Sequence, residues 1–262
     1  MAKIALFRTG RRVCYGAVEG NQVVEIKGNI FGKFSLTSQR HKLSEVKLLA
    51  PTSPRTCIGG PGLHYRSHIE FASRITGRPV APTALPTPWR KGENCIIGPE
   101  EPIVIPKDSS GDVHFEGELV VVIGKQCRHA TEANAMEFVF GYTCGNDVSE
   151  RTWQNKDSNF WRAKGCDTFG PVGPWIATDI NPNNLKLEVR LNGRVMQKAS
   201  TSELIHGIPI IIKTISQSIT LLPGDLIFTG TPGSTQAMKP GDIVEVELSG
   251  IGVLRNPVVA EK

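Results

Sequence analysis

Residues 115–124 read FEGELVVVIG, which places two glutamates at the start of a run with the composition of a buried strand. Side chains two positions apart on a strand point to the same face, so Glu116 and Glu118 should lie side by side. Two carboxylates beside apolar surface are unfavourable without a counter-charge, and hard divalent cations such as Mg2+, Mn2+ or Ca2+ take carboxylate oxygens as ligands. The alternative is an edge strand with one solvated face, where the pair needs no ion.

Length, charge and cysteine content restrict the class of protein. The 262 residues suit either one large domain or a large domain with a small appendage. The net charge is +5, but the basic residues are scattered, which argues against nucleic-acid binding and is compatible with an anionic small-molecule substrate. The six cysteines form no C-x-x-C pair and are expected to be reduced core residues. With no signal-peptide pattern and no apolar run of ~20 residues, we expect a cytoplasmic protein that does not bind membranes.

Short β-prone runs separated by turns dominate the chain. Residues 1–50 are expected to form a small N-terminal β domain, and residues 51–262 a larger domain. Asn192-Gly193 is a strong hairpin signal in the second domain. Further strands are expected near residue 103 and over 113–123, and helices over 65–76, 131–140 and 203–218. This pattern predicts a β-rich mixed α/β fold.

Three further segments carry polar residues with more than one interpretation. Asp147 follows a β-prone run and is either a metal ligand or an ordinary helix cap. Lys164 stands among small and apolar residues, so it either turns inward to balance carboxylates or is solvated. Residues 228–233, FTGTPG, form either a simple turn or a cradle of hydroxyl and N–H groups for a carboxylate. Serine-nucleophile, phosphate-loop and dinucleotide motifs are missing from the sequence.

Six ordered sequence blocks together resemble the fumarylacetoacetate hydrolase superfamily, in particular its 2-hydroxyhepta-2,4-diene-1,7-dioate isomerase-like group. The resemblance extends from about Cys57 to Val258 and rests on FEGELVVVIGK, GYTCGNDVSERTWQ, AKGCDTFGPVGPW, LNGRVMQ, LLPGDLIFTGTPGS and PGDIVEVELSGIG. It implies a β-roll catalytic domain, commonly a homodimer, with a small N-terminal domain in some members.

The resemblance also implies roles for individual residues. Glu116, Glu118 and Asp147 would bind one divalent ion, usually Mg2+ or Mn2+, and Lys164 would lie next to it, facing the substrate. Gln154 and Thr231 match positions that contact substrate, and Arg151 matches one that lines or supports the site. Three carboxylates and one divalent ion leave one surplus negative charge, which Lys164 would offset before an anionic keto acid binds.

The segment around His68 departs from the family pattern, in which a histidine is followed three residues later by a glutamate. Here about three extra residues near Gly60-Pro61-Gly62 lengthen the preceding turn, and His64 replaces the usual asparagine. The acid after His68 is Glu70, only two positions on, where a helix would point it to nearly the opposite side. His68 is the candidate base, and Glu70 is kept as its candidate acid partner.

Two further features of this region bear on metal binding and specificity. His64 and His68 would share a helical face and could bind metal as a pair, although two unrelated lid histidines are the simpler interpretation. Residues 89–92, WRKG, stand where many relatives have a Lys-Pro pair, which changes a loop near the substrate.

A metal ion on the 2-oxo group of a small acid stabilises an enolate, and several reactions use that enolate. Our first expectation is hydrolytic cleavage of a C–C bond in a β-diketo acid of the acylpyruvate or fumarylpyruvate type, with His68 activating water. The alternative is a decarboxylase, or an isomerase or tautomerase, that acts on a 2-oxo dicarboxylic acid of the 2-hydroxymuconate type. The altered segment from His64 to Phe71 gives that alternative weight.

Overall fold

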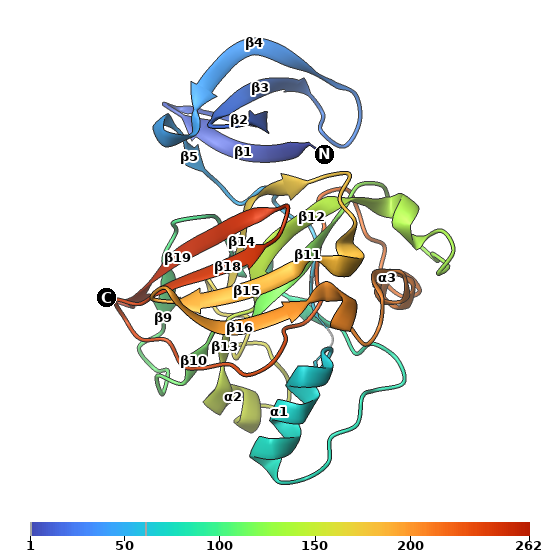
Figure 1. The fold of residues 1–262 in the computed structure, drawn as a ribbon, viewed down its shortest axis with the longest axis vertical. Coiled ribbons are helices and arrows are strands. Elements are labelled where there is room, and N and C mark those ends of the chain that lie inside the picture. Colours follow the sequence, from blue (N-terminus) through green and yellow to red (C-terminus); the bar gives the residue numbers. More distant parts are fainter. Residues whose placement is uncertain (1, 61) are drawn as a thin grey trace.

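Strands dominate the computed structural model, which describes residues 2–60 and 62–262. Pro61, part of the lengthened turn, lies outside the described residues. Figure 1 shows a small unit built from β1 to β5 above a larger body that contains the other strands and α1, α2 and α3. The β-rich mixed fold expected from the sequence is confirmed.

The largest sheet runs through both units, because β1 pairs with β14. In spatial order its strands are β4 (Phe34–Lys42), β3 (Gln22–Gly28), β2 (Arg12–Glu19), β1 (Lys3–Thr9), β14 (Gly170–Ala177), β12 (Val139–Asn146), β11 (Gly117–Ile123), β17 (Leu226–Phe228), β6 (Cys57–Gly59) and β7 (Trp89–Lys91). Two short strands join it at the side, β5 (Lys47–Leu48) on β1 and β8 (Ile96–Ile97) on β14.

Two smaller sheets and three helices complete the body. One sheet has the order β16 (Arg194–Ser200), β15 (Lys186–Leu191), β18 (Ile243–Leu248), β19 (Gly252–Ala260) and β9 (Ile103–Ile105), and the other pairs β10 (Val113–His114) with β13 (Ser149–Glu150). The helices are α1 (Arg66–Thr76), α2 (Arg151–Lys156) and α3 (Ile208–Ser216). Figure 1 places α1 and α2 together at the end of the body remote from the small unit.

Strand β11 lies inside the large sheet, between β12 and β17, and every one of its residues is buried. Leu119, Val121 and Ile123 point into one hydrophobic core, whereas Val120 and Val122 point into a second. Burial of such a side chain contributes about 1.5–3 kcal/mol, so the strand is firmly held on both faces. An edge strand with a solvated face was therefore the wrong alternative for this segment.

Several predicted elements are confirmed and two need correction. The helix over 65–76 forms as α1 and ends at Gly77 in the left-handed conformation, and the Asn192-Gly193 hairpin joins β15 to β16. The helix expected over 131–140 is wrong. The side chains of Thr131 and Asn134 accept each other's backbone N–H groups, which favours a turn; a single 3-10 turn (Ala135–Phe138) follows, and then β12.

The helix predicted over residues 203–218 begins later in the structure than expected. Residues Thr201–Glu203 form a separate 3-10 turn, closed by a capping box between Ser200 and Glu203. Helix α3 begins only at Ile208, with Pro209 in its first turn, where the missing N–H costs nothing.

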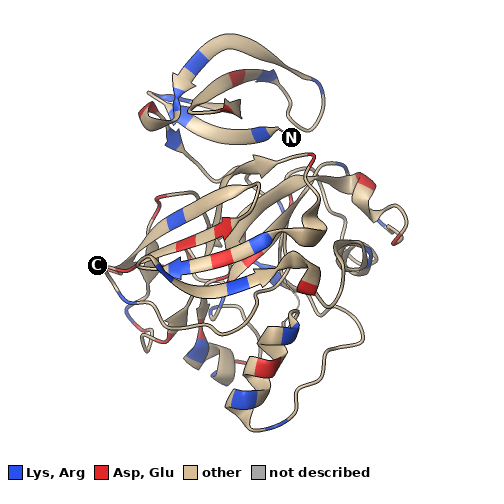
Figure 2. Ribbon diagram, in the orientation of Figure 1, with Lys and Arg blue, Asp and Glu red and all other residues tan. Residues whose placement is uncertain are grey.

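Charge and thiol chemistry agree with the sequence. Figure 2 shows acidic and basic residues interspersed over both units. The six cysteines are free thiols. Among the described residues, no helix has the length and apolar content needed to cross a membrane.

Candidate active site

Three carboxylates meet where β11 begins and β12 ends. Glu118 lies on β11, Glu116 precedes that strand, and Asp147 follows β12; the strand register pairs Gly117 with Asn146 and so brings the three together. The backbone N–H of Asp147 donates to Glu116 O at 2.8 Å, and the N–H of Glu116 donates to Asn146 Oδ1 at 2.8 Å. One oxygen from each carboxylate lies within 4.8 Å of the others.

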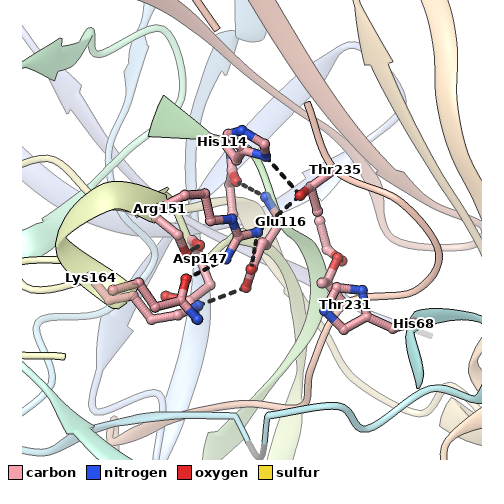
Figure 3. A network of polar contacts seen from close by, with 12 residues as sticks. His68, His114, Glu116, Asp147, Arg151, Lys164, Thr231 and Thr235 are labelled. Carbon is pink, nitrogen blue, oxygen red and sulfur yellow. Dashed lines mark hydrogen bonds and ion pairs between the residues drawn. The ribbon is translucent and has the colours of Figure 1, made fainter. Parts of the chain in front are cut away.

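Three cationic side chains hold two of these carboxylates. Lys164 Nζ donates to Glu116 at 2.7 Å and to Asp147 at 2.6 Å (Figure 3). Arg151 Nη2 donates to the other oxygen of Glu116 at 2.6 Å. Lys91 Nζ, fully buried, donates to the second oxygen of Asp147 at 2.8 Å. Three negative charges thus face three positive ones.

Glu118 is held differently from its two neighbours. Its carboxylate accepts the backbone N–H of Gly230 at 2.6 Å, and its side chain is almost completely buried. Burial, followed by the charges of Asp147 and Glu116, raises the pKa of Glu118 well above its usual value. Burial would also raise the pKa of Glu116, but Lys164 and Arg151 outweigh it and lower that pKa. Among residues 2–60 and 62–262, no cationic side chain forms an ion pair with Glu118, and a carboxylate in that position beside two others fits a divalent cation with oxygen ligands.

The triad opens into a cavity of about 90 Å3 whose lining includes His68, Arg151, Gln154, Lys164 and Thr231. The structure therefore brings together the predicted metal ligands, the predicted lysine and four further predicted site residues. Gln154 accepts a hydrogen bond from Arg151 at 2.6 Å, and the Thr231 hydroxyl donates to Gly117 O at 2.9 Å. Their contact with substrate remains a prediction.

His68 lies on α1 and has a backbone partner. Its Nδ1 is 2.6 Å from Gly233 O, and because a carbonyl can only accept, Nδ1 carries the proton. Nε2 is then the basic nitrogen. Burial lowers the pKa of His68, so the ring is neutral at pH 7.

Glu70 and His64 lie away from the positions that a catalytic or metal-binding role would need. Glu70 is exposed, and within the described residues the cavity lining is formed by other side chains. His64 precedes α1 instead of sharing its face with His68. Its Nδ1–H donates to Thr229 O at 2.7 Å and its Nε2 accepts the N–H of His206 at 3.0 Å, so both ring nitrogens tie chain segments together.

Sequence reasoning missed two groups of supporting residues. Lys91 was considered only as part of the altered segment WRKG, which stands where many relatives have a Lys-Pro pair. The lysine in that segment could have been recognised as a candidate inward-facing cation. Gln197, in the LNGRVMQ block, is buried; its Oε1 accepts the N–H of Gly117 and its amide donates to Thr231 Oγ1 at 3.0 Å. The second group is Thr235, which accepts a hydrogen bond from Arg151, and His114, which is hydrogen-bonded to Thr235 (Figure 3).

Two family models match this chain. The model described as "Fumarylacetoacetate (FAA) hydrolase C-terminal" matches residues 57–259, and "Rv2993c-like, N-terminal" matches residues 2–51. Protein Rv2993c of Mycobacterium tuberculosis is 45% identical over 240 residues, covering 90% of this chain and 87% of the relative. The mitochondrial oxaloacetate tautomerase Fahd2a of Rattus norvegicus is 34% identical over 228 residues, covering 82% of this chain and 70% of the relative.

Solved structures with this fold include enzymes of different reaction types. The 5-carboxymethyl-2-hydroxymuconate delta-isomerase from Mycobacterium smegmatis matches with a TM-score of 0.90 and 40% identity, covering 99% of this chain and 100% of that one. The maleylpyruvate hydrolase from Sphingobium sp. SYK-6, in complex with manganese(II) and pyruvate, matches with a TM-score of 0.81 and 28% identity, covering 99% and 100%. Because the first family model spans most of the sequence and includes all three triad carboxylates, the chain belongs to the fumarylacetoacetate hydrolase family.

Proposed function

We propose that the protein is a divalent-metal-dependent tautomerase or isomerase that moves a proton on a small anionic 2-oxo acid. The observation that carries this proposal is the environment of His68. A neutral imidazole, oriented by a backbone carbonyl, lines the same cavity as three buried carboxylates. Such a base accepts and returns a proton at neutral pH.

The residues that line the cavity have distinct roles in this reaction. Glu116, Glu118 and Asp147 would hold the ion, which when bound would polarise the 2-oxo group as a Lewis acid. Lys164 and Arg151 line the cavity and supply positive charge toward substrate oxygens. In the enol-to-keto direction, His68 Nε2 takes up the proton of the enol hydroxyl, and the imidazolium so formed then gives a proton to C3. Substrate and product therefore differ only in the positions of a proton and a double bond, and His68 ends neutral again.

The charge balance supports an anionic reactant. Lys91, Lys164 and Arg151 contact Glu116 and Asp147, so three positive charges equal the three carboxylates in number, although none of these ion pairs is with Glu118. A bound divalent ion would therefore give the site a net charge of +2, instead of the net charge of zero expected when Lys164 was the only cation counted. The carboxylate of a 2-oxo acid and its enolised oxygen together carry two negative charges.

Hydrolysis of a C–C bond, our first expectation from the sequence, is the second candidate. It is favoured by the similarity to a maleylpyruvate hydrolase. It needs a base strong enough to activate water, and a carboxylate beside the histidine is the usual support for such a base. Glu70 is exposed and outside the cavity, so the proton-transfer reaction fits the geometry better.

One experiment separates the two reactions. The protein, stripped of metal and then supplied with Mg2+ or Mn2+, is mixed in D2O with oxaloacetate and with acetylpyruvate, and the products are followed by NMR. We expect metal-dependent acceleration of proton exchange at C3 without cleavage of the carbon chain, and no acceleration by Glu118→Ala. Catalysed release of pyruvate and acetate from acetylpyruvate, without catalysed exchange, would overturn the proposal in favour of hydrolysis.

A further inference from the structure

Trp89 lines the triad cavity, next to the groups proposed to hold the ion and the substrate. It begins β7, in the segment WRKG where the sequence departs from many relatives. Alternate residues of a strand share a face, so Trp89 and Lys91 point the same way, and Lys91 reaches the triad through Asp147. The indole ring is therefore placed to act on the charges of the site.

Two contacts fix the orientation of this ring. Strand β6 pairs Gly59 with Trp89, and a Cβ atom on Gly59 would lie 2.0 Å from Cε2 of the indole. The ring can lie across β6 because that position is a glycine. The ring of Phe160 meets the indole edge-on, with centroids 5.6 Å apart and an interplanar angle of 80°. The indole is thus held in place by the fold itself.

Two ammonium groups lie over the indole ring. Nζ of Lys91 is 5.4 Å from the ring centroid, and Nζ of Lys164 is 5.8 Å from it. A cation within about 6 Å of an aromatic face is attracted by the electron-rich ring, most strongly by tryptophan and where water is excluded. Both lysines are buried, so the ring contributes to holding their charges.

The two lysines differ in their other partners. Lys91 Nζ donates to Asp147 at 2.8 Å and to the backbone oxygen of Lys164 at 2.5 Å, so it is anchored partly by the main chain. Lys164 Nζ donates to the carboxylates of Glu116 and Asp147, which are proposed metal ligands. A divalent ion would compete for those oxygens, whereas an indole ring does not ligate such an ion. Trp89 is therefore a neighbour that Lys164 keeps when metal binds.

We propose that Trp89 is a positioning residue whose ring holds the ammonium group of Lys164 at the cavity when a divalent ion occupies the triad. The inference rests on the proposed function, which assigns Lys164 to the oxygens of the substrate. A flexible lysine loses conformational entropy when a ligand fixes it. A contact with the ring that exists before the substrate binds removes part of that loss and strengthens binding of the anion.

Binding of oxalate tests this role without turnover. Oxalate is an unreactive dianion with a carboxylate beside a further anionic oxygen, as in an enolised 2-oxo acid. Metal-stripped protein is titrated by calorimetry with Mg2+ and then with oxalate. Trp89→Leu keeps an apolar side chain but removes the ring, and it should raise the Kd for oxalate about fivefold or more while changing the Kd for Mg2+ less than about twofold. Trp89→Phe retains a ring and should recover most of the loss.

Trp161→Leu is the matched control. Trp161 is 69% exposed, and its ring also lies near a cation, with Cζ of Arg162 at 5.8 Å from the centroid. This change should leave the Kd for oxalate unaltered. If Trp89→Leu weakens Mg2+ as much as oxalate, the ring supports the metal ligands instead of Lys164, and the inference is wrong.

A second background shows whether the ring acts through Lys164. In Lys164→Met the ammonium group is absent, so Trp89→Leu should change the Kd for oxalate by less than about twofold. Equal losses in both backgrounds would overturn the inference, because the ring would then act by packing, through Lys91 or on the ligand directly. An unchanged Kd for oxalate when Lys164 is present would overturn it as well.

Two further measurements keep the result unambiguous. Replacement of Trp89 by tetrafluorotryptophan preserves the shape of the side chain and removes most of its attraction for a cation, so it should reproduce the loss even if Trp89→Leu does not fold. Failure of the proposed function would be seen separately, as the lack of catalysed C3 proton exchange in the Mg2+-loaded wild-type protein, because oxalate binding requires no turnover.

Discussion

Replacing Glu118 by glutamine should stabilise the metal-free protein, although it removes a proposed metal ligand. The triad oxygens lie within 4.8 Å of one another, and two like charges at that separation repel by about 3–4 kcal/mol at an effective dielectric of about 20. Glu118 has two such neighbours, and Lys164 and the Gly230 N–H offset part of the repulsion. A glutamine keeps an oxygen for Gly230 and loses the charge. We expect a net gain of about 2–4 kcal/mol, or roughly 5–10 °C in melting temperature.

The gain should depend on pH in a defined direction. Because the folded chain raises the pKa of Glu118, it binds this proton more tightly than the unfolded chain. The stability of the wild-type protein therefore falls as the pH rises from the ordinary glutamate value toward the raised one. The difference between Glu118→Gln and wild type should be small near pH 4 and largest above the raised pKa.

Urea unfolding with a chelator, and again with Mg2+ or Mn2+, measures both effects. Saturating metal at a hundred times its Kd should add about 2.7 kcal/mol to the wild-type protein and little to Glu118→Gln. Glu70→Gln makes the same chemical change at an exposed position of α1 and should alter neither value by more than about 0.5 kcal/mol. If Glu118→Gln is no more stable than wild type in chelator at pH 8, the argument that this carboxylate is uncompensated is wrong.

Three further predictions concern other residues. His68→Ala should reduce kcat for proton exchange by a factor of about 10²–10⁴ without weakening Mn2+ binding measured by calorimetry. In the wild-type protein, the acid limb of the pH–rate profile should lie below pH 6.5, because burial lowers the pKa of His68. Lys91→Met should cost about 3–5 kcal/mol in urea unfolding without metal, because it leaves Asp147 short of a buried partner, whereas the exposed Lys156→Met should be neutral. Burial lowers the pKa of His64 to about 4, so the folded chain binds this proton less readily than the unfolded chain. The free energy of unfolding should therefore fall by roughly 3 kcal/mol between pH 6.5 and pH 4. His64→Asn should flatten that part of the plot of unfolding free energy against pH, measured by urea unfolding.

The sequence predicted the triad because its signals are local. Glu116 and Glu118 are two residues apart at the start of one strand, and two of the family-like sequence blocks contain Asp147 and Lys164. The positions of Gly77 and Asn192-Gly193 marked a helix end and a hairpin for equally local reasons, since each requires a left-handed backbone conformation. The helix over 131–140 failed because side-chain hydrogen bonds and the strand-forming residues from Val139 onward overrode a weak helical preference.

Contacts between residues that lie far apart in the sequence could not be predicted from local sequence patterns. Lys91 and Asp147 are 56 positions apart, and Arg151 and Thr235 are 84 apart, so only the packed sheet brings them together. The same holds for Glu70. Its spacing from His68 was suspicious on a helix, but its exposure became evident only once α1 was placed against the rest of the chain.

The contacts of Lys164 connect the stability of this site to its chemistry. Its ammonium group donates to one oxygen of Glu116 and one of Asp147, and these belong to the same triad that a divalent ion would use. A divalent cation held by Glu116 and Asp147 would compete with Lys164 for these oxygens, because the second oxygen of each carboxylate is occupied by Arg151 or Lys91. Lys164 would then be displaced toward the cavity that it already lines, where an anionic oxygen is its natural partner. On this argument the lysine stabilises the triad when metal is absent and becomes available to the substrate when metal is present, which explains why a fully buried site can retain three carboxylates.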